Sequence, residues 1–455
     1  MAQPALSTYS VAAGQPIHGG RWPGGRLSGN ADLAAALAAG AMEPNAADLG
    51  GGVVAGDVVA AGQAATAPHA RTILVGDSLT THLLGYNLSP FFWANGLLGA
   101  PLKPVGNLGV SGNTVADVLA RINNSYGGGG LSGSSPLGYV VLRIGTNDAR
   151  STAIHGGIQA SYDALLAAIL TYADVCIVCA VPPIGSPESG GSNVAGYNAW
   201  LQAKCATNPD RLWWVDDCVT VRNGSAWAAG YAPADGIHFT PRAVYQMGVD
   251  GAAALAGRFD AFGYASPLST DPADKYPAVA QWWPNPTNVG SGTLVNNLGI
   301  GSYGAGFGWS NSIVAADAGD PNPVPWQRLT PTAVVYGGDS FMLLSGALTG
   351  RTITSSDPAA LEIVYQIRFN AFAGQYYRWL RAYVLGAENG NVTPDLDLKL
   401  GQSNMTHTVT VRGSLPRASG GAPQSAATLR LELSPSTSFT GAMGSIDVRC
   451  IAVRG

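Results

Sequence analysis

Cysteine, charged residues and long apolar runs are all scarce in this chain. Five cysteines in 455 residues are too few, and odd in number, for a disulfide framework. No His/Cys cluster has metal-ligand spacing, so we expect no metal and no cofactor. Only 11% of the residues are charged, the net charge is −4 and no basic stripe is visible, which excludes nucleic acid as a partner. No aliphatic run reaches the roughly 18 residues of a membrane span, and the N-terminus lacks the basic and apolar regions of a secretory signal.

The cysteines leave two questions open. Cys176 and Cys179 have the spacing of a redox motif but lie in an apolar, strand-like run, where a free cysteine packs as a small hydrophobic residue. Cys205 and Cys218 either pair, in an oxidising compartment, or remain thiols.

Glycine, proline and apolar residues are abundant by contrast. The chain has 61 Gly, 29 Pro and 46% hydrophobic residues, and its length suits two or three domains. Residues 1–70 form an Ala/Gly-rich arm with few large side chains, in which only a short helix over 30–40 is expected. Such an arm is either a flexible leader or a segment that becomes ordered on another subunit or particle.

Residues 71–262 alternate between two kinds of segment. Short β-branched and aliphatic runs have the length of buried strands, and apolar residues recur at helical spacing between them. Strands are predicted over 72–75, 103–109, 139–144, 175–181 and 212–215. Helices are predicted near 79–88, 113–122, 158–173, 193–206 and 241–257. This alternation predicts an α/β domain, with a mostly parallel sheet covered by helices on both faces.

The residues that follow each strand are the most informative, because ligands of parallel sheets bind at the carboxyl ends of the strands. Ser78 follows the first strand, Gly112 ends the segment after the second, and Asn147 follows the third. Asp235 and His238 stand in a loop beyond the fifth strand. Each has a simpler explanation alone: Ser78 as a helix cap, Asn147 and Asp235 as turn residues, His238 as a loop histidine. Packing alone does not explain all of them in this order.

Four blocks of this sequence resemble those of the SGNH (GDSL-type) hydrolase family. The blocks are Gly76-Asp-Ser-Leu79, the segment ending at Gly112, Gly145-Thr-Asn-Asp148 and Asp235-Gly-Ile-His238. They cover roughly residues 71–257, less than half of the chain. The resemblance implies a three-layer, flavodoxin-like parallel sheet and a carboxylic ester hydrolase.

The resemblance also implies a role for each residue. Ser78 would attack an ester carbonyl as the nucleophile. His238 would accept its proton and return it to the leaving alcohol, and Asp235 would hold the imidazole in the correct tautomer. The oxyanion would be held by the backbone N–H groups of Ser78 and Gly112 and by the side-chain amide of Asn147. A Cβ at Gly112 would crowd the substrate oxygen.

The family includes lipases, thioesterases, arylesterases and deacetylases of sugars and polysaccharides, and the fold does not choose among them. Trp227 and Tyr231 come shortly before Asp235 and are the best-placed candidates for lining a substrate site. Asp77 and Asp148 are expected to be turn and cap residues.

The C-terminal part has a different pattern. Residues 263–291 are Pro-rich, without helical periodicity, and are predicted to be a linker. Within 292–455, short alternating strands are predicted near 293–300, 332–336, 341–344, 361–369, 376–385, 406–412, 427–433 and 445–453. These predict an antiparallel, jelly-roll-like β-sandwich that binds carbohydrate or mediates assembly. His407 stands alone in it, without a hydrolytic constellation.

The simplest hypothesis is a modular carbohydrate esterase. It removes acyl groups, with acetyl favoured, from a cell-surface polysaccharide. The layout weakly resembles a spike or fibre protein of a phage or phage-like gene transfer particle, which would act outside the cell on the virion surface. The partners would then be the glycan, other virion proteins bound through the arm, and further copies of the chain, with a trimer favoured. The alternatives are a glycan-binding spike without catalysis and a free lipase or thioesterase.

Overall fold

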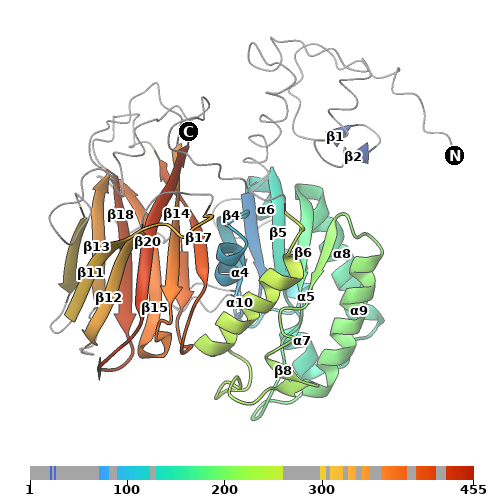
Figure 1. Ribbon diagram of the computed structural model, residues 1–455. Helices are drawn as coiled ribbons and strands as arrows, with labels where there is room; N and C mark the ends of the chain where they lie inside the picture. Colours follow the sequence, from blue (N-terminus) through green and yellow to red (C-terminus); the bar gives the residue numbers. More distant parts are fainter. Residues whose placement is uncertain are drawn as a thin grey trace, which may run out of the picture.

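The computed structural model describes two parts of the chain in detail (Figure 1). In the first part it describes residues 71–80, 90–122, 130–134 and 136–259. In the second part it describes residues 298–303, 308–320, 326–334, 341–348, 360–386, 396–416 and 427–454. Two short strands near the N-terminus, β1 (Arg21–Trp22) and β2 (Gly25–Arg26), complete the description. The helix predicted over 30–40, most of the helix near 79–88 and the linker over 263–291 lie outside these residues.

The first part contains the predicted parallel sheet. Its strands are β3 (Arg71–Gly76), β4 (Lys103–Gly109), β5 (Leu137–Arg143), β6 (Ala173–Cys179) and β7 (Leu212–Val215). They run parallel in the order β4-β3-β5-β6-β7. The interior strand β3 has almost no exposed surface at Ile73, Leu74 and Val75, so both faces of the sheet are covered. This confirms the α/β prediction.

Helices cover the two faces of this sheet in separate groups. The helices α5 (Val115–Arg121), α8 (Gly156–Tyr172) and α9 (Val194–Ala206) share one hydrophobic core with it. The helices α4 (Phe91–Leu97) and α10 (Pro241–Leu255) share another. Sequence patterns did not predict α4, α6 (Gly130–Ser134) or α7 (Thr146–Ser151), which are too short for a clear period. None of the helices in the described ranges is long and apolar enough to cross a bilayer.

The four cysteines discussed above are all buried free thiols, so the Cys205–Cys218 pairing that the sequence left open is not formed. Burial raises the pKa of the Cys205 thiol to about 12 and that of Cys179 to about 12 as well. Cys176 and Cys179 lie on β6 within the sheet, as the packing interpretation predicted.

The second part is an antiparallel β-sandwich, as predicted. One sheet has the order β10-β13-β18-β15-β16 and the other β11-β12-β20-β14-β17, with β19 beside β12. Their bounds are β10 (Leu298–Tyr303), β11 (Gly308–Val314), β12 (Trp326–Val334), β13 (Phe341–Leu348), β14 (Ala360–Asn370), β15 (Tyr377–Gly386), β16 (Leu396–Lys399), β17 (Thr408–Pro416), β18 (Ala427–Pro435), β19 (Phe439–Thr440) and β20 (Ser445–Arg454). The strands β11, β16 and β19 were not predicted. Alternation along β14 buries Tyr365, Ile367 and Phe369 between the sheets.

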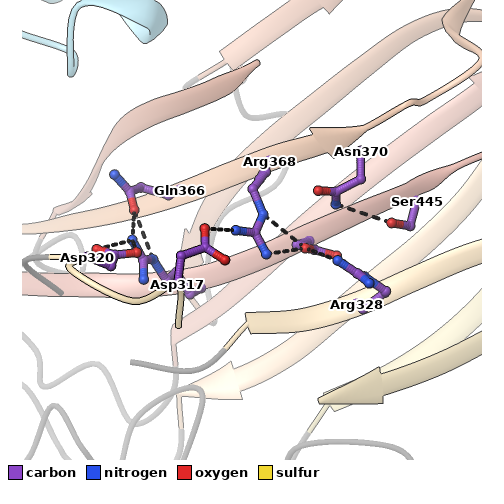
Figure 2. A network of polar contacts seen from close by, with 9 residues as sticks. Asp317, Asp320, Arg328, Gln366, Arg368, Asn370 and Ser445 are labelled. Carbon is purple, nitrogen blue, oxygen red and sulfur yellow. Dashed lines mark hydrogen bonds and ion pairs between the residues drawn. The ribbon is translucent and has the colours of Figure 1, made fainter. Parts of the chain in front are cut away.

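The opposite face of the six-stranded sheet carries a network of charged side chains (Figure 2). At its centre Asp447 of β20 is fully buried. It accepts hydrogen bonds from Arg328 of β12 at 2.8 and 2.9 Å and from Arg368 of β14 at 3.0 and 2.7 Å. Desolvation opposes the charge of Asp447, but these hydrogen bonds outweigh it and hold the pKa below its ordinary value. The buried carboxylate thus joins three neighbouring strands of the sheet.

The same network fixes the segment that follows β11. Arg368 pairs with Asp317 at 2.5 Å, and Arg449 pairs with Asp320 at 2.8 Å (Figure 2). Both guanidinium groups also lie over the ring of Trp326, at 4.3 and 3.9 Å from its centroid. These contacts tie residues 317–320 to the outer face of the sheet.

The α/β part and the sandwich pack directly against each other through α4 and α10 (Figure 1). Trp93 of α4 is fully buried, lies edge-on to Tyr245 of α10 and contacts Phe369 of the sandwich. Its indole N–H donates to the Lys399 carbonyl at 3.1 Å. Tyr245 is in turn hydrogen-bonded to His407 at 2.7 Å. Because one hydrophobic cluster contains residues of both parts, the sandwich is packed against the α/β domain rather than only tethered to it.

Candidate active site

Ser78, His238 and Asp235 lie within hydrogen-bond distance of one another. His238 Nε2 is 3.0 Å from Ser78 Oγ, and His238 Nδ1 is 2.7 Å from Asp235 Oδ2. The sequence separates Ser78 from His238 by 160 residues. The structure joins them because β3 and the loop before α10 end at the same edge of the sheet. The side chains of His238 and Asp235 are 47% and 53% exposed, so this edge is open to solvent.

The turn after β3 has very little space. A Cβ on Gly76 would lie 2.0 Å from the Arg143 carbonyl oxygen, so no side chain fits there. Asp77 follows and is fully buried, with its Oδ1 accepting a hydrogen bond from the Leu79 N–H at 3.0 Å. Burial raises the pKa of Asp77 to about 7, although this hydrogen bond opposes the rise. The buried Asp77 side chain therefore stabilises the turn through this hydrogen bond, while the next residue, Ser78, remains partly exposed.

The Asp235–His238 turn is held from two sides. Asp235 Oδ1 accepts the backbone N–H groups of Ile237 and His238, each at 2.9 Å. Desolvation raises the pKa of Asp235, but the hydrogen bonds from Ile237 and His238 outweigh it and leave the pKa below its ordinary value. Asp235 is therefore ionised at neutral pH and favours a proton on His238 Nδ1.

The second support of this turn is the carbonyl of Gly236. It accepts the indole N–H of Trp227 at 3.0 Å and the Gly185 N–H at 2.9 Å. Gly236 has φ +78°, and a Cβ there would lie 2.1 Å from the Gly185 oxygen, so only glycine fits. Trp227 itself is 8% exposed. The sequence placed Trp227 at the substrate surface, whereas its ring packs under the loop and its N–H holds Gly236.

Tyr231 lies closer to the surface than Trp227. It is partly buried, and the guanidinium group of Arg242 lies 4.8 Å from its ring centroid. Its proposed contact with substrate stays a prediction.

The three predicted oxyanion donors come from three separate segments. Within the described residues, the backbone N–H groups of Ser78 and Gly112 make no hydrogen bond. The Asn147 amide nitrogen donates to the Asn113 carbonyl at 2.9 Å, which leaves its second N–H available. Gly112 has φ +79°, and no atom lies within 4 Å of a Cβ placed on it. Glycine is thus required here by backbone conformation, and the space above it is open to a substrate oxygen.

Further contacts, which sequence reasoning missed, lock these segments together. Asp148 accepts the N–H of Val115 at 3.0 Å and so joins the third block to the first turn of α5. Arg121 of α5 donates to the Gly76 carbonyl at 3.1 Å and to the side chain of Asn113. Nothing in the spacing of these residues signals such contacts, because they depend on how α5 packs.

A serine, a histidine and an aspartate joined in this order at the carboxyl edge of a parallel sheet are the constellation of a serine hydrolase. Residues 74–244 match the model of the family described as GDSL-like Lipase/Acylhydrolase. This part of the chain is a GDSL-like lipase/acylhydrolase domain, as the four blocks predicted, and the family acts on esters. A search of curated proteins finds no match.

Solved structures similar to this chain include several hydrolases. One is a lipase/acylhydrolase from Enterococcus faecalis, with 21% identity over 42% of this chain and 97% of that one and a TM-score of 0.32. Another is a GDSL-like lipase from Bacteroides thetaiotaomicron, with 19% identity, 45% and 98% coverage and a TM-score of 0.33. A third is a catalytic mutant of an acetylxylan esterase from Geobacillus stearothermophilus, with 17% identity, 42% and 94% coverage and a TM-score of 0.33.

Proposed function

We propose that the chain is a serine esterase that removes acyl groups, with acetyl favoured, from a cell-surface polysaccharide. The observation that carries the esterase proposal is the pair of contacts at His238, 3.0 Å to Ser78 Oγ and 2.7 Å to Asp235. The distances lie in the range in which a general base takes a proton from a nucleophile.

The chemistry proceeds in two steps. Ser78 Oγ forms a bond to the ester carbonyl carbon while its proton passes to His238 Nε2. Asp235 accepts the Nδ1–H bond and stabilises the imidazolium that forms. The N–H groups of Ser78, Gly112 and Asn147 hold the negative charge on the carbonyl oxygen. The C–O bond to the alcohol then breaks, the alcohol takes the proton from His238, and water releases the acyl group by the same steps.

The exposure of the site supports a large substrate. Asp235 and His238 are about half exposed, so an ester carried on a polymer reaches Ser78 without entering a tunnel. A small apolar cavity lies under α4, between residues such as Phe91, Ile177 and Leu255, and contains none of the three catalytic residues.

The test is hydrolysis of p-nitrophenyl acetate against longer-chain p-nitrophenyl esters by wild type and by Ser78→Ala. We expect acetate turnover that falls by roughly 10⁴-fold or more in the variant, because the nucleophile is lost. A preference for long chains would indicate a lipase instead. Folded wild-type protein that turns over neither these esters nor acetylated polysaccharides would leave a glycan-binding protein.

The particle role is part of the same proposal. The arm over residues 1–70 would attach the enzyme to other proteins of a virion or related particle, and the chain would be an oligomer, with a trimer favoured, acting outside the cell. The order of arm, hydrolase and sandwich supports this. Copurification with particles, and the mass of the purified protein in solution, test it; a monomer that never associates with particles contradicts it.

A further inference from the structure

A loop of the sandwich, residues 400–404, lies against the first turn of α10. Gly401 is the point of contact. A Cβ placed on it would lie 2.7 Å from the Cβ of Pro241 and 3.2 Å from the backbone nitrogen of Arg242. The sandwich and the hydrolase domain therefore touch here at backbone distance.

This contact is close to the active site along the chain. Pro241 is the first residue of α10, and His238 lies three positions before it. Thr240 caps the helix by accepting the N–H of Ala243 at 3.1 Å. The sandwich loop thus contacts the helix that begins directly after the loop of the catalytic histidine.

The loop is fixed rather than free to swing. Gly374 packs beneath it, where a Cβ would lie 2.9 Å from the Gln402 carbonyl oxygen. Met405, directly after the loop, exchanges two backbone hydrogen bonds of 2.9 Å with Phe372. The backbone of this loop is therefore held in place before any ligand arrives, which lowers the entropy lost on binding.

The surface at this junction is polar with one aromatic ring. On the sandwich side Gln402 is partly exposed and Ser403 and Asn404 are exposed. On the hydrolase side Arg242 is exposed and lies over the ring of Tyr231. Amide groups both donate and accept hydrogen bonds, so they suit the hydroxyl groups of a sugar, and a tyrosine ring suits its apolar face.

We propose that Gln402 and Asn404 of the sandwich, together with Tyr231 and Arg242, form a polysaccharide-binding subsite that holds the chain whose acyl group is at Ser78. The inference rests on the proposed esterase function and assigns part of its substrate binding to the second domain. It gives the contact between the sandwich and α10 a role in substrate binding. Polymer specificity would then belong to the junction, and ester chemistry to the hydrolase domain alone.

The test compares wild type with the double variant Gln402→Ala/Asn404→Gly. Glycine is used at 404 because Asn404 has φ +55°, which disfavours alanine. The matched control is Gln202→Ala, an exposed amide on α9, away from the junction. Acetate release is measured from p-nitrophenyl acetate, from glucose pentaacetate and from partially acetylated xylan, glucomannan and pectin. Thermal unfolding is followed for all three proteins.

We expect wild type to prefer at least one polymer over glucose pentaacetate. The double variant should lose roughly tenfold in kcat/KM on that polymer, through KM, since two hydrogen bonds are removed. Its turnover of p-nitrophenyl acetate and its Tm should match those of wild type and Gln202→Ala. The inference is overturned if no polymer is preferred, if the variant keeps full polymer activity, or if both kinds of substrate are affected equally. If wild type hydrolyses none of these esters, the esterase proposal itself is refuted.

Discussion

Replacement of Trp227 by phenylalanine should slow catalysis although the Trp227 ring is buried beneath the catalytic loop. The indole N–H is one of two donors to the Gly236 carbonyl, and the Gly185 N–H remains after the change. The carbonyl is therefore weakened but not left unsatisfied, so the loss is that of one net hydrogen bond, about 0.5–1.5 kcal/mol. If this whole free energy is lost from transition-state stabilisation because His238 is misplaced, kcat falls roughly 2- to 13-fold.

The assay is steady-state hydrolysis of p-nitrophenyl acetate with a matched control. Trp213 is as buried as Trp227, at 7% against 8%, but packs on Tyr139 and Phe259 at the other end of the sheet. Trp213→Phe should therefore lose comparable stability and keep its kcat. In Trp227→Phe the KM for this small ester should stay unchanged. Equal losses of kcat in both variants, or no loss in Trp227→Phe, would refute a positioning role.

Two further predictions concern buried carboxylates. The pKa of Asp77 is raised from 3.8 to about 7 by burial, so the folded state holds this proton more tightly than the unfolded state. The free energy of unfolding should therefore fall by on the order of 4 kcal/mol as pH rises from about 4 to 7. In Asp77→Asn, urea unfolding should show a flatter dependence of this free energy on pH, and an unchanged slope would contradict the prediction. Asp447→Ala should cost about 1–3 kcal/mol, because Arg328 and Arg368 lose a fully buried partner, while Arg368 keeps its pair with Asp317. Asp163→Ala, which breaks a surface pair with Lys204, should cost less than about 1 kcal/mol, and equal costs would count against the buried network.

Much of the hydrolase domain was predictable because its signals are local. The Ile-Leu-Val run of β3 specifies a strand buried on both faces, and Thr114 with Asp117 forms the capping box that starts α5. Ser78, Gly112, Asn147 and the Asp235–His238 loop each follow a strand, so a parallel sheet brings them to one edge whatever the details of packing. The sandwich was predictable as a class from alternation, but β11, β16 and β19 were missed.

The sequence by itself therefore determined the class of fold and the residues that meet at the site. The alternation of strands and helices along the chain, and the residues that follow each strand, can be read from short segments. Only the tertiary structure decided what supports them. It turned Trp227 from a candidate substrate contact into the residue that holds Gly236. It also joined the sandwich to α4 and α10, where Trp93 donates to a carbonyl 306 residues away. Such contacts arise from the packing of distant elements, and no local pattern of residues encodes them.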